Sequence, residues 1–142
     1  MLIVCGSPLI SMLSQIHHTF SKSGLQKIEF LYTTKAPTAV NGVVNPEETL
    51  FLPRLRHIQD SLGATNMGLK LFITGECEAI KQGFKMPRYL NRRLGERDLT
   101  DAVGNDGNTL AFVCGPPGMT DEIVEFLGGV VGKGKVFCEK WW

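Results

Sequence analysis

Cys114-Gly115-Pro116-Pro117-Gly118-Met119 is the stretch of this chain that says most about its fold. It lies between an apolar run at residues 110–113 and a segment with helical spacing at residues 120–127. The prolines fix the turn, and Pro117 suits the first position of a helix because it has no N–H group to leave unpaired. We therefore predict a strand that ends at the thiol and a helix that begins directly after it. Such junctions form the carboxyl edge of a parallel sheet, where open α/β folds bind ligands.

The rest of the chain alternates in the same way. Runs of apolar and β-branched residues predict strands at residues 2–5, 28–33, 69–74, 110–114 and 136–138. Apolar residues at helical spacing predict helices after Pro8 and at residues 51–62 and 117–127, with one or two helical turns at 98–103. Residues 36–46 and 76–97 are expected to be irregular.

This alternation predicts one domain over residues 1–142, of the α/β class. We expect a Rossmann-like, doubly wound parallel sheet of five strands in the order 3-2-1-4-5. In that order the first strand lies beside the fourth. The crevice between Cys5 and Cys114 is then the point where the winding reverses, and it is the expected binding site.

The composition excludes several classes of protein. A net charge of +1 predicts no strong attraction to nucleic acid or to an anionic membrane. The apolar start at residues 2–5 is too short for a signal peptide and lacks a basic flank, and no run of about 18 apolar residues follows. We therefore expect a soluble, intracellular chain. Its 4 cysteines have neither Cys-x-x-Cys nor zinc-site spacing, which favours free thiols and predicts no metal site.

The segment at residues 114–119 resembles the Cys-Gly-Pro-Pro-x-Met motif of the ferredoxin–NADP reductase and cytochrome b5 reductase superfamily. In that superfamily the motif follows the last core strand of the nicotinamide-nucleotide domain. The end of the chain, Phe137-Cys138-Glu139-Lys140-Trp141-Trp142, is similar to the terminus of the oxidoreductase NAD-binding domain-containing protein 1 group. The resemblance covers nearly the whole chain, but only as the second half of the usual two-domain enzyme.

The resemblance implies a function and a partner. The expected function is the NAD(P)H-binding half of a flavin-dependent oxidoreductase, which passes hydride from NAD(P)H to FAD. Related enzymes carry FAD in an N-terminal β-barrel, whereas this chain begins at the first strand of the nucleotide domain. FAD is therefore expected on a missing or separate domain or on a flavoprotein partner, and the isolated chain is expected to be inactive. The resemblance is compatible with a mitochondrial location, although the chain has no transit peptide.

The resemblance also implies where the dinucleotide binds. In the superfamily a long glycine-rich turn holds the pyrophosphate, and here Gly6, Ser7 and Pro8 form a shorter one, which predicts weakened affinity. Adenosine contacts are expected at the ends of the second and third strands. There Lys35 could meet a 2′-phosphate and Glu76 a free ribose hydroxyl, so NADH and NADPH both stay open. The residues at these two ends are Thr33, Thr34, Lys35, Thr74 and Glu76. Ordinary polar loop residues are the alternative interpretation.

Three further positions have both a functional and an ordinary interpretation. Arg93 matches a loose superfamily pattern beside the adenosine phosphate, but its basic neighbourhood also fits a solvated surface. Cys114 corresponds to a superfamily cysteine that positions the nicotinamide ring, and the other residues of its turn are expected to contact the cofactor with it. The alternative is that Cys114 is an ordinary buried cysteine, which packs as a small hydrophobic residue. Trp142 could lie over a flavin ring or pack on this domain. The turn residues that accompany Cys114 are Gly115, Pro116, Pro117 and Met119.

A second class of function stays open at this point. Because the phosphate turn is short, the chain could instead be a non-catalytic α/β binding or interaction domain that kept the fold of the superfamily.

Overall fold

A computed structural model describes residues 2–6, 27–36, 49–74, 89–90, 92–105 and 107–140, with only the backbone at residues 2–6 and 89. The helix expected after Pro8 and most of the loop expected at residues 36–46 lie outside these ranges.

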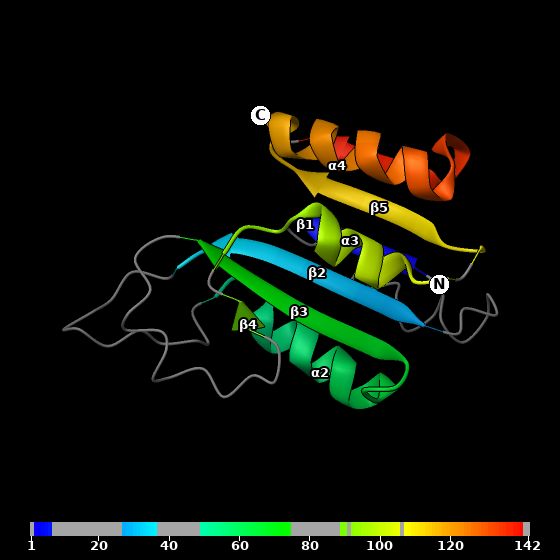
Figure 1. Cartoon of the computed structure of the whole chain (residues 1–142). Coiled ribbons are helices and arrows are strands. Elements are labelled where there is room, and N and C mark those ends of the chain that lie inside the picture. The colour runs from blue at the N-terminus through cyan, green and yellow to red at the C-terminus, as the bar shows by residue number, and fades with distance from the viewer. Residues whose placement is uncertain are drawn as a thin grey trace.

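The described residues form a central sheet of 6 strands, and every pairing among these strands is parallel (Figure 1). Because the strands are parallel, their carboxyl ends all lie at the same edge. Their order across the sheet is β4-β3-β2-β1-β5-β6. The strands are β1 (Leu2–Gly6), β2 (Ile28–Lys35), β3 (Met67–Thr74), β4 (Tyr89–Leu90), β5 (Leu110–Gly115) and β6 (Val136–Lys140).

The expected five-stranded sheet with the order 3-2-1-4-5 is wrong, because the sheet has 6 strands. The strand that the sequence did not reveal is β4, which pairs with Leu71 and Phe72 of β3. It consists of 2 residues in a segment rich in basic side chains. A run of that length has no periodicity that distinguishes a strand from a loop.

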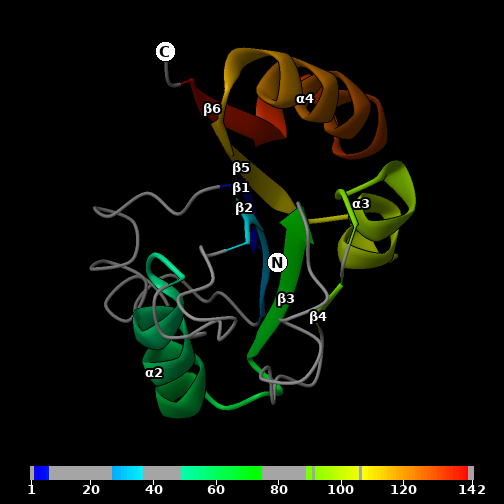
Figure 2. The ribbon, with the colours of Figure 1, turned by 90° about the vertical axis from the view of Figure 1, so that its left-hand side faces the viewer.

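Helices cover both faces of the sheet (Figure 2). The helix α2 (Leu52–Leu62) lies on one face, and α3 (Glu96–Val103) and α4 (Pro117–Val131) lie on the other. A 3₁₀ turn, Lys133–Lys135, connects α4 to β6. The described helices include none that is long and apolar enough to cross a bilayer.

Local sequence explains where these helices begin and end. Pro53 lies in the first turn of α2, where its missing N–H group costs nothing, and Gly63 ends that helix with a φ of 83°. Pro117 opens α4 in the same way, and Gly132 ends it with a φ of 96°. The helix α4 therefore continues to Val131, beyond the expected end at residue 127.

Two apolar cores result, one on each side of the sheet. Phe30 and Tyr32 of β2 pack toward α2, whereas Leu31 between them packs toward α3 and α4. This alternation follows from the period of two along a strand. Each fully buried large side chain contributes about 1.5–3 kcal/mol to folding. Because both faces of the sheet are packed against helices, the strand ends at its carboxyl edge are held in defined positions, as a binding site requires.

Candidate functional site

The winding of the sheet reverses between β1 and β5. From β1 the chain adds β2, β3 and β4 on one side, and from β5 it adds β6 on the other. At the carboxyl end of this pair Gly6 lies opposite Cys114 in the register. Cys114 is fully buried and forms no disulfide. This is the place where open α/β sheets bind ligands.

The turn after Cys114 brings backbone close to a side chain. Gly115 is buried, and a Cβ atom at this position would overlap Cε of Met119. Met119 in turn packs against the core under α4. Residue 115 therefore has to be glycine while Met119 keeps its place. The first N–H groups of α4, which have no partner within the helix, begin directly after this turn and suit an anionic group.

Thr120 is a residue of this region that sequence reasoning missed. Its side chain is fully buried, and its hydroxyl oxygen has no hydrogen-bond partner. That oxygen lies 3.8 Å from the point where a Cβ of Gly115 would be. The sequence does show a hydroxyl residue in the first turn of the helix that follows Gly115, and this pattern could have identified Thr120 as a candidate. A buried unpaired hydroxyl beside a strand end is a position where a ligand could supply the missing hydrogen bond.

The ends of β2 and β3 hold the expected adenosine residues next to each other. Lys35 lies opposite Thr74 in the register, and Thr33 lies opposite Phe72. The Thr74 hydroxyl donates to the Thr34 carbonyl at 3.4 Å, and the Thr34 hydroxyl donates to the Lys35 carbonyl at 3.3 Å. The two hydroxyls therefore bind backbone, and the Lys35 side chain extends into solvent.

An arginine of the basic segment has a structural partner instead of a ligand. Arg92 forms two hydrogen bonds with Asp98, from Nη1 to Oδ2 at 2.6 Å and from Nη2 to Oδ1 at 2.7 Å. Its guanidinium also lies 5.4 Å from the ring centre of Phe72. The hydrogen bond from Arg92 is the main reason that the pKa of Asp98 falls below its ordinary value. Asp98 Oδ2 also accepts the N–H of Gly95 at 3.0 Å, so this pair fixes the start of α3.

Arg93, the arginine that the resemblance selected, is exposed on the turn between Arg92 and α3. It lies near the carboxyl edge because β4 ends at that edge, beside Phe72 of β3. The functional interpretation of Arg93 stays a prediction.

Several expected residues cannot be placed. Ser7, Pro8, Glu76 and Trp142 lie outside the described residues. The cysteines whose side chains are described, Cys114 and Cys138, form no disulfide, and the first is buried whereas the second is exposed. Within the described part of the chain no three histidine, cysteine or acidic residues gather as metal ligands would.

Comparisons with known proteins identify the fold and no more. No protein-family model matches the chain, and no curated protein matches it. Its fold is similar to part of a solved structure, the cytochrome P450 reductase GcoB of Amycolatopsis, with a TM-score of 0.62 and 14% sequence identity. The match covers 98% of this chain and 36% of the reductase chain. The chain therefore shares the fold of about a third of a reductase.

Proposed function

We propose that this chain is the NAD(P)H-binding part of a flavin-dependent oxidoreductase of the ferredoxin–NADP reductase type. The observation that carries the proposal is the Cys-Gly-Pro-Pro turn at the point where the winding reverses, with Cys114 opposite Gly6. The fold shared with part of a reductase supports it. The finer resemblance to the oxidoreductase NAD-binding domain-containing protein 1 group belongs to the same proposal and rests on the C-terminal sequence.

The residues at the carboxyl edge suit a dinucleotide. Gly115 offers backbone without a side chain, the first turn of α4 offers N–H groups to a phosphate, and the Thr120 hydroxyl lacks a partner. Lys35, exposed at the end of β2, is the proposed contact for the adenosine ribose or its 2′-phosphate. The nicotinamide supplies the hydride when the dinucleotide is bound, and FAD on another domain or protein accepts it. In this proposal Cys114 positions the ring and keeps water away from it.

Titration of the purified chain with NADH and NADPH tests the binding. We expect a Kd of roughly 0.1–1 mM, or about 4–5.5 kcal/mol, because the turn at Gly6 is short. Amide shifts in NMR spectra should gather at residues 114–120 and at the ends of β2 and β3. Lys35→Ala should weaken NADPH more than NADH. Lys133→Ala, in the 3₁₀ turn at the opposite edge, is the matched control and should change neither.

Two outcomes would contradict this proposal. Amide shifts at other residues would show that the dinucleotide binds at a different site. The absence of any shift at several millimolar would favour a non-catalytic interaction domain.

Activity needs a separate test with a flavin domain. The chain alone should reduce no dye, because a hydride needs an acceptor held within about 3–3.5 Å in aligned geometry. A separately expressed flavin domain of the superfamily should give slow turnover. Cys114→Ala should then lower kcat more than it raises KM, since the buried thiol is proposed to position the ring. Turnover by the lone chain without any flavin would refute the proposal.

A further inference from the structure

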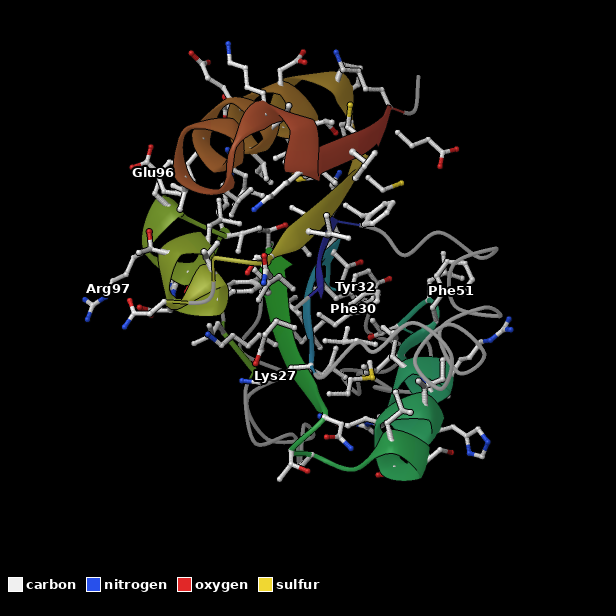
Figure 3. All side chains as sticks on the ribbon, turned by 90° about the vertical axis from the view of Figure 1, so that its right-hand side faces the viewer. Lys27, Phe30, Tyr32, Phe51, Glu96 and Arg97 are labelled. Atoms are coloured by element: carbon white, nitrogen blue, oxygen red, sulfur yellow. The ribbon has the colours of Figure 1, made fainter. Side chains whose placement is uncertain are left out.

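A cavity of about 360 Å³ opens at the edge of the sheet opposite Cys114. It lies where β2 and β3 begin and where α2 ends, since Ile28 pairs with Met67 there. Figure 3 shows Lys27 at this end, below Phe30 and Tyr32 of the same strand region. Its wall consists of Lys27, Glu29, Gln59, Ala64, Thr65, Gly68 and Leu69. The volume is within the range of small-molecule sites.

The cavity wall contains a buried carboxylate that is only half satisfied. Glu29 is 5% exposed. Its Oε1 lies 2.8 Å from Nζ of Lys27, whose side chain is 48% exposed. Its Oε2 is shielded from solvent and has no hydrogen-bond partner. A buried carboxylate oxygen without a donor destabilises the folded chain, so it needs an explanation.

Gly68 makes room for this carboxylate. It lies opposite Glu29 in the register of β2 and β3. A Cβ atom at residue 68 would overlap Oε2 of Glu29 and would lie 2.6 Å from its Cδ. The carboxylate thus occupies the space that any other residue at position 68 would fill. Glu29 cannot be an ordinary surface residue of a strand, because its position depends on the glycine of the neighbouring strand.

We propose that this cavity binds the ammonium or guanidinium group of a small organic cation, with Glu29 as its counter-ion. A cationic donor would satisfy Oε2 by a charge-assisted hydrogen bond. Since Oε2 is shielded, the carboxylate must turn or a neighbour must move for a ligand to reach it, and the half-exposed Lys27 side chain, which is bound to Oε1, can swing out. Ala64, an exposed residue of the cavity wall, provides apolar contact for the carbon chain of the ligand.

Two other wall residues complete the site. Gln59 is held by a hydrogen bond from Nε2 to the Met67 carbonyl at 3.0 Å, so its amide has a fixed orientation and its oxygen is an acceptor. The hydroxyl of Thr65, another wall residue, is a second possible acceptor. A metal ion fits less well, because the described residues bring no three histidine, cysteine or acidic side chains together.

The test uses the full chain and three probes that share a butyl chain: butylamine, butylguanidine and 1-butanol. Saturable amide shifts at Thr65 and Gly68 with either cation, in the millimolar range, would support the site, and the tighter of the two identifies the charged group. The neutral alcohol should give no such shifts. Equal shifts with all three probes would overturn the proposal, since the carboxylate would then have no role.

Variants separate the role of the charge from that of the fold. Glu29→Gln keeps the shape and should weaken the cation at least tenfold. Lys27→Met removes the internal competitor and should strengthen it several-fold. Glu125→Gln, an exposed carboxylate on α4, is the control and should change nothing. Unchanged binding by Glu29→Gln in a chain that still gives the native spectrum would overturn the proposal. NADH binding is independent of this result, because its proposed site is at the other edge.

Discussion

The phenol of Tyr32 donates a hydrogen bond of 2.6 Å to the carbonyl oxygen of Leu50, which lies 18 residues further along the chain. This bond ties the central strand β2 to the turn that starts α2. The next residue, Phe51, has a φ of 64°, a left-handed conformation that is uncommon for a bulky side chain. Burial raises the pKa of Tyr32, against the opposing effect of a hydrogen bond with Thr34, so the phenol remains a donor at neutral pH. The bond therefore stabilises a strained helix start.

Tyr32→Phe should lower the free energy of unfolding by about 1–1.5 kcal/mol, because it leaves the ring in place and removes the donor. Urea unfolding measures the loss. Hydrogen exchange should also accelerate in the first turn of α2 more than in β5. An unchanged stability would show that water replaces the phenol at the Leu50 carbonyl.

Thr49→Val, unlike Tyr32→Phe, should not lower the free energy of unfolding. Thr49 is 3% exposed, and its hydroxyl has no hydrogen-bond partner. Replacing a buried unpaired hydroxyl by a methyl group of similar shape should leave the stability unchanged or raise it by up to about 1 kcal/mol. A loss of more than about 1 kcal/mol in the same unfolding assay would mean that the hydroxyl has a partner in solution.

Asp98→Asn should change the response of stability to pH. The folded state lowers the pKa of Asp98 below its ordinary value of 3.8, chiefly through the hydrogen bond from Arg92. The stabilisation is therefore fully present above about pH 4–5 and is lost as the pH falls through the folded pKa. At pH 7 the variant should be less stable by about 1–2 kcal/mol, and the difference from the native chain should shrink toward pH 3.

Asp101→Asn is the control for this measurement, since Asp101 is an exposed carboxylate on the same helix. It should leave the pH profile of the native chain nearly unaltered. If the difference between Asp98→Asn and the native chain stays constant down to pH 3, the pair with Arg92 does not act through its charge.

Gly115→Ala should weaken both folding and binding of the dinucleotide. The added methyl group overlaps Cε, the flexible end of Met119, which must turn away and lose part of its packing against the core, at a cost of about 1 kcal/mol. A double variant with Met119→Ala should cost less than the sum of the two single changes. Gly118→Ala is the matched control: apart from its own helix backbone and chain neighbours, nothing lies within 4 Å of the added Cβ, and alanine favours the helix by about 0.5–1 kcal/mol. If the losses of stability from the two single changes add up in the double variant, the proposed contact between residue 115 and Met119 is wrong.

The sequence predicted the elements that have enough apolar residues to show a period. The strands predicted at residues 110–114 and 69–74 and the helix start at Pro117 followed from their apolar runs and prolines, and the structure has them at Leu110–Gly115, Met67–Thr74 and Pro117. The two-residue strand β4 was missed because it owes its pairing to β3 and not to its own residues. The prediction was therefore wrong in the number of strands in the sheet.

The candidate site was only partly visible for a similar reason. Cys114 and Gly115 belong to a sequence motif whose residue types by themselves predict the end of a strand. The pairing of Arg92 depends on Asp98, and this contact requires the folded turn. The unpaired oxygens of Thr120 and Glu29 depend on burial by residues far away in the chain. Sequence alone gives the type of such side chains but not their solvation.

The outer strands of the sheet bear on how this protein behaves at high concentration. A sheet whose two margins were long and apolar would recruit strands from other molecules and form aggregates. One margin here is β4, which offers 2 residues, and the other is β6, which ends in the exposed charges of Glu139 and Lys140. Lys140 is further held by Asp121 of α4 at 2.6 Å. The half-exposed ring of Phe137 stacks on Phe112 of β5, and the charges of Glu139 and Lys140 follow it along this margin, which should keep concentrated solutions free of fibrils although 43% of the chain is hydrophobic.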